Sequence, residues 1–145
     1  GLPTLADDSG LEVDYLQGAP GVYSARFSGV HGDDEANNAL LLEKLKGVPD
    51  EKRRARFVAA LALVDPLGGE YTARGVCEGF ITHEPVGEHG FGYDPIFRLA
   101  GDNRTLAQFL PEEKNAVSHR AQALKKMVPH IKEMTFHKIM RGEKA

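Results

Sequence analysis

Two adjacent carboxylates stand near the start of the sequence, in residues 6–10, which read ADDSG. Side chains that are neighbours on an extended chain point to opposite sides, so one carboxylate can face a site while the other braces its surroundings. Mg²⁺ takes one or two carboxylates together with substrate phosphates, and a carboxylate beside it can orient or deprotonate a water. The competing interpretation is a solvated Asp-Asp turn.

A second stretch, residues 91–97, reads FGYDPIF and crowds two aromatic rings around one carboxylate. Phe91 or Tyr93 could present a ring face to a heterocyclic base, and Asp94 could accept hydrogen bonds from a ribose or a base edge. Gly92 permits a close approach between ligand and backbone. The competing interpretation is a turn followed by aromatic residues of the core.

A third stretch, residues 112–124, reads EEKNAVSHRAQAL. Lys114, His119 and Arg120 gather positive charge there, and Ser118 is a suitable cap for a helix that begins at His119. Such a break would direct free backbone N–H groups and basic side chains at one point. The competing interpretation is the solvated face of one amphipathic helix.

The intervening segments predict a mixed α/β domain whose long central sheet positions these stretches. Strands are expected at 11–16, 55–66 and 70–85, the last two as a hairpin. The uninterrupted apolar run in residues 55–66 predicts a strand covered on both faces. Residues 33–46 predict a helix with Ala36, Leu40, Leu41 and Leu45 on its buried face, and the C-terminal third is expected to be helical.

Bulk properties limit the partners. The chain has 145 residues with 41% apolar and 27% charged side chains, which predicts one domain, residues 1–145. A net charge of -3 favours a small ligand over a nucleic acid polymer, and the basic run at 52–56 is interpreted as a solvated edge. A single cysteine, Cys77, and the lack of a long apolar run favour a reducing, cytoplasmic compartment and no membrane partner.

In this order, the three stretches resemble the inosine triphosphate pyrophosphatase family, from about Leu5 to about Val128. The family hydrolyses non-standard purine nucleoside triphosphates (those of inosine, deoxyinosine and xanthosine) to the monophosphate and pyrophosphate with Mg²⁺. The resemblance implies an α/β fold with a long mixed central sheet flanked by helices, and a homodimer. The family also begins with a strand and a Thr/Ser-x-Asn-x-x-Lys phosphate loop, which this sequence lacks, so we expect it to be a trimmed form.

The resemblance also implies residue roles. Asp8 is matched to the acid–base residue and Mg²⁺ ligand. The matched substrate contacts are Ser9 beside it, Phe91, Gly92, Tyr93 and Asp94 in the nucleoside pocket, Lys114 near the nucleotide, and His119 and Arg120 at the base. A donor-only arginine suits the 6-keto acceptor of hypoxanthine or xanthine and leaves the 6-amino group of adenine poorly paired. Two alternatives remain: a pyrophosphatase for other modified nucleotides, and a non-catalytic nucleotide-binding fragment.

Overall fold

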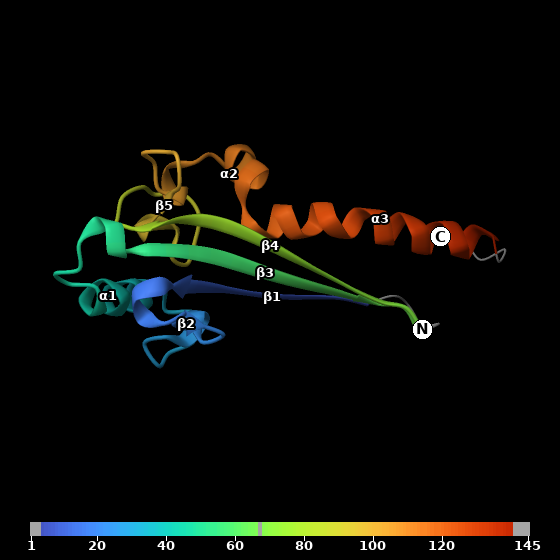
Figure 1. The fold of residues 1–145 in the computed structure, drawn as a ribbon, viewed down its shortest axis with the longest axis horizontal. Helices are drawn as coiled ribbons and strands as arrows, with labels where there is room; N and C mark the ends of the chain where they lie inside the picture. Colours follow the sequence, from blue (N-terminus) through green and yellow to red (C-terminus); the bar gives the residue numbers. More distant parts are fainter. Residues whose placement is uncertain (1–3, 67, 141–145) are drawn as a thin grey trace.

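A long antiparallel sheet forms the centre of the molecule (Figure 1). The computed structural model describes residues 4–66 and 68–140, with side chains through residue 131. Within these residues the strands lie in the order β2-β1-β3-β4-β5, and each neighbouring pair is antiparallel. The strands are β1 Thr4–Val13, β2 Pro20–Gly21, β3 Arg54–Val64, β4 Glu70–Ile81 and β5 Phe97–Leu99. The α/β fold class is confirmed, but the described sheet is antiparallel and not mixed.

Strand β1 runs without interruption through the two adjacent carboxylates. Asp7 pairs with Leu61 of β3, and Asp8 pairs with Ala60. The competing turn interpretation of residues 6–10 is therefore wrong, because this segment is part of the ladder. The strand expected at 11–16 ends at Val13, where a 3₁₀ turn begins.

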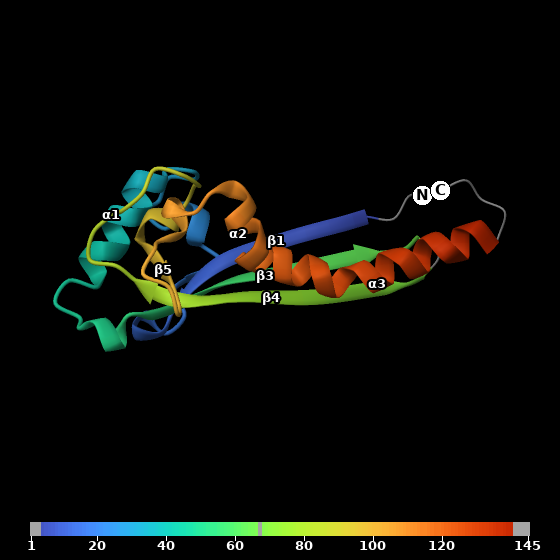
Figure 2. The same cartoon turned by 90° about the horizontal axis from the view of Figure 1, so that it is seen from above.

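Strand β3 is covered on one face only, which corrects the prediction that both faces are buried. Its buried set is Ala55, Phe57, Ala59, Leu61 and Leu63. The alternate set includes Arg54, Ala60 and Val64, which are exposed. The prediction of two covered faces failed because small alanines and a terminal valine lie on the open face, where their exposure carries little penalty. The long helix α3 lies along the covered face (Figure 2).

The helices follow the predicted boundaries closely. They are α1 Asp34–Lys44, α2 Pro111–Val117 and α3 His119–Met140, with 3₁₀ turns η1 Asp14–Leu16, η2 Ser24–Arg26, η3 Asp50–Lys52, η4 Asp94–Ile96 and η5 Leu106–Gln108. Asp33 caps α1 by accepting from the Ala36 N–H at 3.1 Å. The predicted break at Ser118 is confirmed, since its Oγ accepts from the Ala121 N–H at 3.1 Å. Among the described helices, none is long and apolar enough to cross a membrane.

Two apolar clusters hold the helices on the sheet. One joins α1 to β1, β3 and the loop before β5, with Leu41 and Leu45 fully buried as predicted. The other lies beneath α3, where Ala123 and Met127 pack on Ala59, Leu61 and Leu63. Burial of these apolar surfaces fixes both ends of the sheet relative to the helices.

Gly75 sets how closely α3 approaches β4. A Cβ added there would lie 2.0 Å from the His119 carbonyl oxygen and 2.3 Å from the Ala123 nitrogen. No other residue type fits at that separation, so glycine allows the first turn of α3 to lie directly on the sheet. This contact places His119 and Arg120 beside β1 and β3.

The interpretation of residues 52–56 as a solvated edge is wrong for Arg53. Its side chain is 1% exposed. It donates to four backbone carbonyls, those of Leu45, Val48, Ile81 and Thr82. The guanidinium therefore joins the end of α1 to the end of β4 instead of facing water.

Candidate functional site

A cavity of about 170 Å³ opens where β1, α1, the loop before η4 and the start of α3 meet. It adjoins a wider groove of about 640 Å³ along α2 and α3. Four residues line both: Phe91, Lys114, His119 and Arg120. The second and third stretches singled out from the sequence thus converge on one hollow, as the pocket interpretation requires.

Phe91 presents its ring to this hollow. The side chain is 61% exposed, so it is not a core residue. Lys114 Nζ lies 4.3 Å from the ring centroid and Arg120 Cζ lies 5.7 Å from it. The ring is therefore an exposed aromatic surface with two cations over it.

Tyr93 has the opposite environment. It is 5% exposed, belongs to the apolar cluster under α1, and donates its hydroxyl to the Ser24 carbonyl at 2.6 Å. Burial raises the pKa of Tyr93 above its usual range, so the hydroxyl stays protonated. Tyr93 borders the cavity, but its ring is packed in the core and its polar group already has a partner.

Asp94 organises the loop from inside. Its side chain is buried, and Oδ2 accepts from the Phe91 N–H at 3.1 Å and from the Lys114 ammonium. A Cβ at Gly90 would lie 2.2 Å from the same oxygen, and Gly90 has a φ of +77°. The carboxylate therefore fixes both the backbone beneath Phe91 and the cation beside its ring.

Helix α1 contacts the backbone of Gly92, the residue after Phe91, and the sequence did not predict this contact. The Gly92 N–H donates to Asp34 Oδ2 at 2.9 Å, and Asn38 Nδ2 donates to the Gly92 carbonyl at 3.1 Å. Asn38 is buried, as is Asn37, which bridges Ser28 and Ala25. Two adjacent asparagines within a helix were the available signal, because buried amides require partners.

His119 is buried beside the cavity and stacks on Phe57, with ring centroids 5.0 Å apart. Burial lowers the pKa of His119 to about 4, and the positive charges of Arg120 and Lys114 lower it further. The expectation that His119 adds positive charge is therefore wrong at neutral pH. Its Nδ1 is buried without a hydrogen-bond partner among the described residues, so it can bind a polar ligand atom.

Arg120 and Ser9 meet on Asp7. Arg120 Nε donates to Asp7 Oδ2 at 3.1 Å, and Ser9 Oγ donates to Asp7 Oδ1 at 3.0 Å. Ser9 lines the cavity and follows Asp7 on the same face of β1. The contact between Asp7 and Arg120 thus joins β1 to α3, which lie far apart in the sequence.

Asp8 lies on the opposite face of β1, outside this cavity. It lines two hollows, of about 180 Å³ and 600 Å³, and Asp7 also lines the larger one. The smaller one shares Ser9 and Gly10 with the cavity of about 170 Å³, so the two meet at the β1 edge. The structure therefore does not bring Asp8 together with the other predicted site residues, although it lies next to Ser9.

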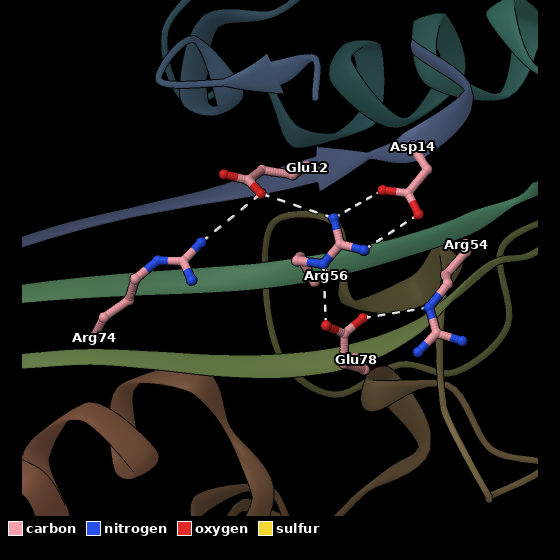
Figure 3. Close-up of polar contacts among 6 residues, drawn as sticks. All are labelled: Glu12, Asp14, Arg54, Arg56, Arg74 and Glu78. Atoms are coloured by element: carbon pink, nitrogen blue, oxygen red, sulfur yellow. Dashed lines mark hydrogen bonds and ion pairs between the residues drawn. The ribbon is translucent and has the colours of Figure 1, made fainter. Parts of the chain in front are cut away.

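An ion-pair network occupies the same sheet face as Asp8 (Figure 3). Arg56 donates to Asp14 at 2.8 Å and to Glu78 at 3.0 Å, and Arg74 lies 4.0 Å from Glu12. The hydrogen bond from Arg56 lowers the pKa of Asp14. Across the described residues Asp8 has no such cationic partner, so its charge is available to a cation or a water.

The described residues contain no cluster of three or more metal-ligating side chains. Mg²⁺ does not need one, since it is commonly held by one or two carboxylates, waters and substrate phosphates. An unpaired carboxylate such as Asp8 fits that pattern. Asp7 fits it less well, because its two oxygens already accept from Ser9 and Arg120.

Comparison with protein families gives a match to the Ham1 family model over residues 1–130. The chain is 59% identical over 131 residues to a Nocardia farcinica protein named dITP/XTP pyrophosphatase, covering 90% of this chain and 64% of that protein. It is 56% identical over 134 residues to a Mycobacterium tuberculosis protein of the same name, covering 92% of this chain and 65% of that one. The chain thus spans just under two thirds of these curated relatives.

Solved structures give the same result for the fold. A Mycobacterium abscessus nucleoside-triphosphatase, also called dITP/XTP pyrophosphatase, superposes with a TM-score of 0.78 at 55% identity, over 90% of this chain and 66% of that one. The Staphylococcus aureus Ham1 protein superposes with a TM-score of 0.86 at 40% identity, over 92% of this chain and 68% of that one.

Proposed function

The chain belongs to the Ham1 family, and from that premise we propose that it hydrolyses non-standard purine nucleoside triphosphates to the monophosphate and pyrophosphate, with Mg²⁺. Inosine, deoxyinosine and xanthosine triphosphates are the proposed substrates. The observation that carries the proposal is the exposed Phe91 ring bordered by Lys114 and Arg120. Stacking of a base on such a ring contributes about 1–3 kcal/mol.

The polar groups around the ring favour a 6-keto purine. Arg120 offers donors only, and a neutral His119 can donate from one ring nitrogen. A 6-keto oxygen accepts such bonds, whereas the 6-amino group of adenine leaves the donors unpaired. Gly92 and Tyr93 form the backbone and wall of the pocket, and Asp94 holds Lys114 near the nucleotide.

Asp8 is the proposed acid–base residue. A water attacks the α-phosphorus and its proton passes to Asp8. The bond from the α-phosphorus to the oxygen between the α- and β-phosphates breaks, and pyrophosphate leaves with that oxygen. Asp8 would also hold Mg²⁺, which when bound offsets the negative charge of the phosphates. Among the described residues no cation pairs with Asp8, which supports this role, because a carboxylate without a cationic partner keeps its charge for the reaction.

The placement of Asp8 requires the nucleotide to cross the edge of β1. The base cavity lies on the α3 face, and Asp8 lies on the other face. Residues 4–10 of β1 pair with β3 on one side, and no described strand pairs with them on the other. The triphosphate would pass over this edge at Ser9, which borders both hollows.

Pyrophosphate release tests the proposal directly. The chain is incubated with inosine, xanthosine, guanosine, adenosine and methylated pyrimidine triphosphates, with and without Mg²⁺. We expect Mg²⁺-dependent turnover that favours inosine and xanthosine triphosphates. Turnover that favours methylated pyrimidines would support the alternative substrate class. Nucleotide binding without turnover would identify a non-catalytic binding protein.

Asp8→Asn tests the role of the carboxylate. Loss of a general base typically lowers the rate by about 10²–10⁴-fold, so we expect a decrease of at least about a hundredfold in kcat. Glu12→Gln is the matched control, since Glu12 lies on the same strand and face but within the ion-pair network. Equal rates for Asp8→Asn and wild type would remove Asp8 from the chemistry.

We assign the proposed activity to the cytoplasm, where nucleotide pools are maintained, and to a homodimer, as the family resemblance implies. Cys77 is a free, buried thiol in the structure. Sedimentation velocity over a range of protein concentrations measures the oligomeric state. A monomer at every concentration would contradict the dimer.

A further inference from the structure

Asp7 is the residue of the first acidic pair whose carboxylate contacts Arg120, a residue that lines the cavity. We infer that Asp7 is a specificity-determining positioning residue, which holds Arg120 so that its free N–H groups face the 6-keto edge of a bound purine. This inference rests on the proposed function, because it names a residue that sets base preference at the same site. Asp7 itself touches no base in this arrangement and acts through Arg120.

The hydrogen bonds define the geometry. Asp7 Oδ2 accepts from Nε of Arg120 at 3.1 Å, which leaves the two terminal nitrogens of the guanidinium without a hydrogen-bond partner in the described part of the chain. An arginine carries its donors in a planar fork, so fixing Nε fixes the direction of the others. The guanidinium carbon lies over the Phe91 ring, 5.7 Å from its centroid, and this is the ring on which the base would stack.

Asp7 also aligns a second element of the site. Its other oxygen accepts from Ser9 Oγ at 3.0 Å, and Ser9 borders both the base cavity and the hollow beside Asp8. One carboxylate therefore sets the positions of a base-side cation and of the hydroxyl at the β1 edge. Because Asp7 and Asp8 are adjacent on a strand, this link joins base recognition to the strand that carries the proposed acid–base residue.

The ion pair between Asp7 and Arg120 should contribute little to the stability of the fold. Its removal can therefore test a positioning role without unfolding the protein. The side chains of Arg120 and Asp7 are 48% and 40% exposed. Exposed ion pairs stabilise folded proteins only slightly, since water screens them and ordering two long side chains costs entropy. Removing Asp7 should therefore leave the fold intact and expose its effect on Arg120.

The experiment compares inosine and adenosine triphosphates in wild type, Asp7→Ala, Arg120→Ala and the double variant. Both kcat/KM and equilibrium binding are measured, the latter with non-hydrolysable analogues. We expect Asp7→Ala to lower kcat/KM for inosine triphosphate about tenfold, mainly through KM, as for loss of one charged hydrogen bond. The value for adenosine triphosphate should change little, so discrimination falls by the same factor.

Two further results distinguish positioning from a general structural effect. The double variant should discriminate no worse than Arg120→Ala alone, because Asp7 acts through that side chain. Asp7→Glu should recover part of the discrimination. Asp14→Ala is the control, since Asp14 is a similarly exposed strand-end carboxylate paired with Arg56 on the opposite face.

Unchanged discrimination in Asp7→Ala, or additive losses in the double variant, would overturn the inference. A wild type that binds the inosine analogue more tightly than the adenosine analogue but releases no pyrophosphate would refute the proposed hydrolysis alone. The binding measurements would then decide the role of Asp7. A wild type that binds neither analogue would overturn both.

Discussion

Phe91 and Tyr93 lie two residues apart on one loop, but their rings have different environments. Phe91 is exposed in the cavity, whereas Tyr93 is packed beneath α1 with its hydroxyl bonded to Ser24. The two rings point to different places because the backbone between them is fixed. Asp94 accepts a hydrogen bond from the Phe91 N–H, and Asp34 accepts one from the Gly92 N–H. Of the two rings, Phe91 is therefore the one that we propose to stack on a base.

Phe91→Ala should weaken binding of inosine triphosphate by about 1–3 kcal/mol, which is the range measured for base stacking on aromatic side chains. The fold should remain intact because the ring is exposed. Phe80→Ala is the matched control, since Phe80 is also bordered by two arginines, Arg54 and Arg98, but lies outside the cavity. Isothermal titration calorimetry measures both. Equal affinities for Phe91→Ala and wild type would exclude stacking on this ring.

His119 makes stability depend on pH. Its pKa is lowered to about 4 in the folded protein from 6.5, so below pH 6.5 the unfolded chain binds the extra proton first. The stabilisation is therefore complete above the unfolded pKa and is lost as pH falls toward 4. Between pH 7.5 and pH 5 this group should cost about 2 kcal/mol of unfolding free energy.

Urea unfolding at the two pH values checks this prediction. His119→Phe keeps a ring against Phe57 and removes the titrating group. The variant should lose about 2 kcal/mol less than wild type on acidification. Equal losses in the two proteins would show that His119 is not the group responsible.

At the scale of elements, the apolar pattern predicted α1 well, but the buried polar groups of that helix were not predictable. Leu41 and Leu45 are buried as their spacing indicates. Asn38 is also buried, and its partner, the Gly92 carbonyl, lies 54 residues away in sequence. A periodicity detects which face of a helix is apolar, but it does not detect a hydrogen bond to a distant loop.

The same reason limits what the sequence reveals about the contacts within the predicted site. Residue types identified the cavity, since Phe91, Lys114, His119 and Arg120 do meet there. The roles of Asp94 and Tyr93 depend on contacts with other elements, which spacing along the chain does not contain. The faces of Asp7 and Asp8 depend on where β1 continues through them, and the strand expected at 11–16 did not extend back to these residues.

Arg53 joins two elements that the sequence does not connect. Its guanidinium is buried and donates to carbonyls at the end of α1 and the end of β4. Arg53→Met keeps much of the side-chain volume but removes the donors to these carbonyls, although the Leu45 carbonyl keeps its bond from the Val48 N–H at 3.0 Å. We expect a loss of about 3 kcal/mol in unfolding free energy, since each unsatisfied buried group costs about 1–3 kcal/mol.

Denaturant unfolding measures this loss. Arg54→Met provides the control, because Arg54 is the next residue, is exposed, and makes a long ion pair with Glu78 at 3.7 Å. A change below about 0.5 kcal/mol is expected there, as for most surface substitutions. Similar stability losses in the two variants would contradict the role of Arg53 as a buried link.

At the scale of the molecule, the proposed ligand would contact segments that are far apart in sequence. Ser9 comes from β1, Phe91 from the loop before η4, and Arg120 from α3. These elements pack in different apolar clusters, with α3 on β3 and β4 and the loop beside α1. A nucleotide in the cavity would thus act as an additional link between the two ends of the sheet.

Because the complete site exists only when these elements are assembled, the nucleotide should bind the folded state and not the unfolded chain. A non-hydrolysable inosine triphosphate analogue at one hundred times its Kd should then raise the unfolding free energy by about 2.7 kcal/mol. For a chain of this size that corresponds to an increase in Tm of roughly 5–10 °C. Phe91→Ala should show a smaller increase at the same analogue concentration, since weaker binding reduces the linkage. Scanning calorimetry with and without Mg²⁺ measures these shifts. An equal shift in Phe91→Ala and wild type would mean that the analogue binds elsewhere.

Amide hydrogen exchange gives a second check. If the analogue slowed exchange in residues 89–94 alone, the ligand would order one loop without linking β1 to α3.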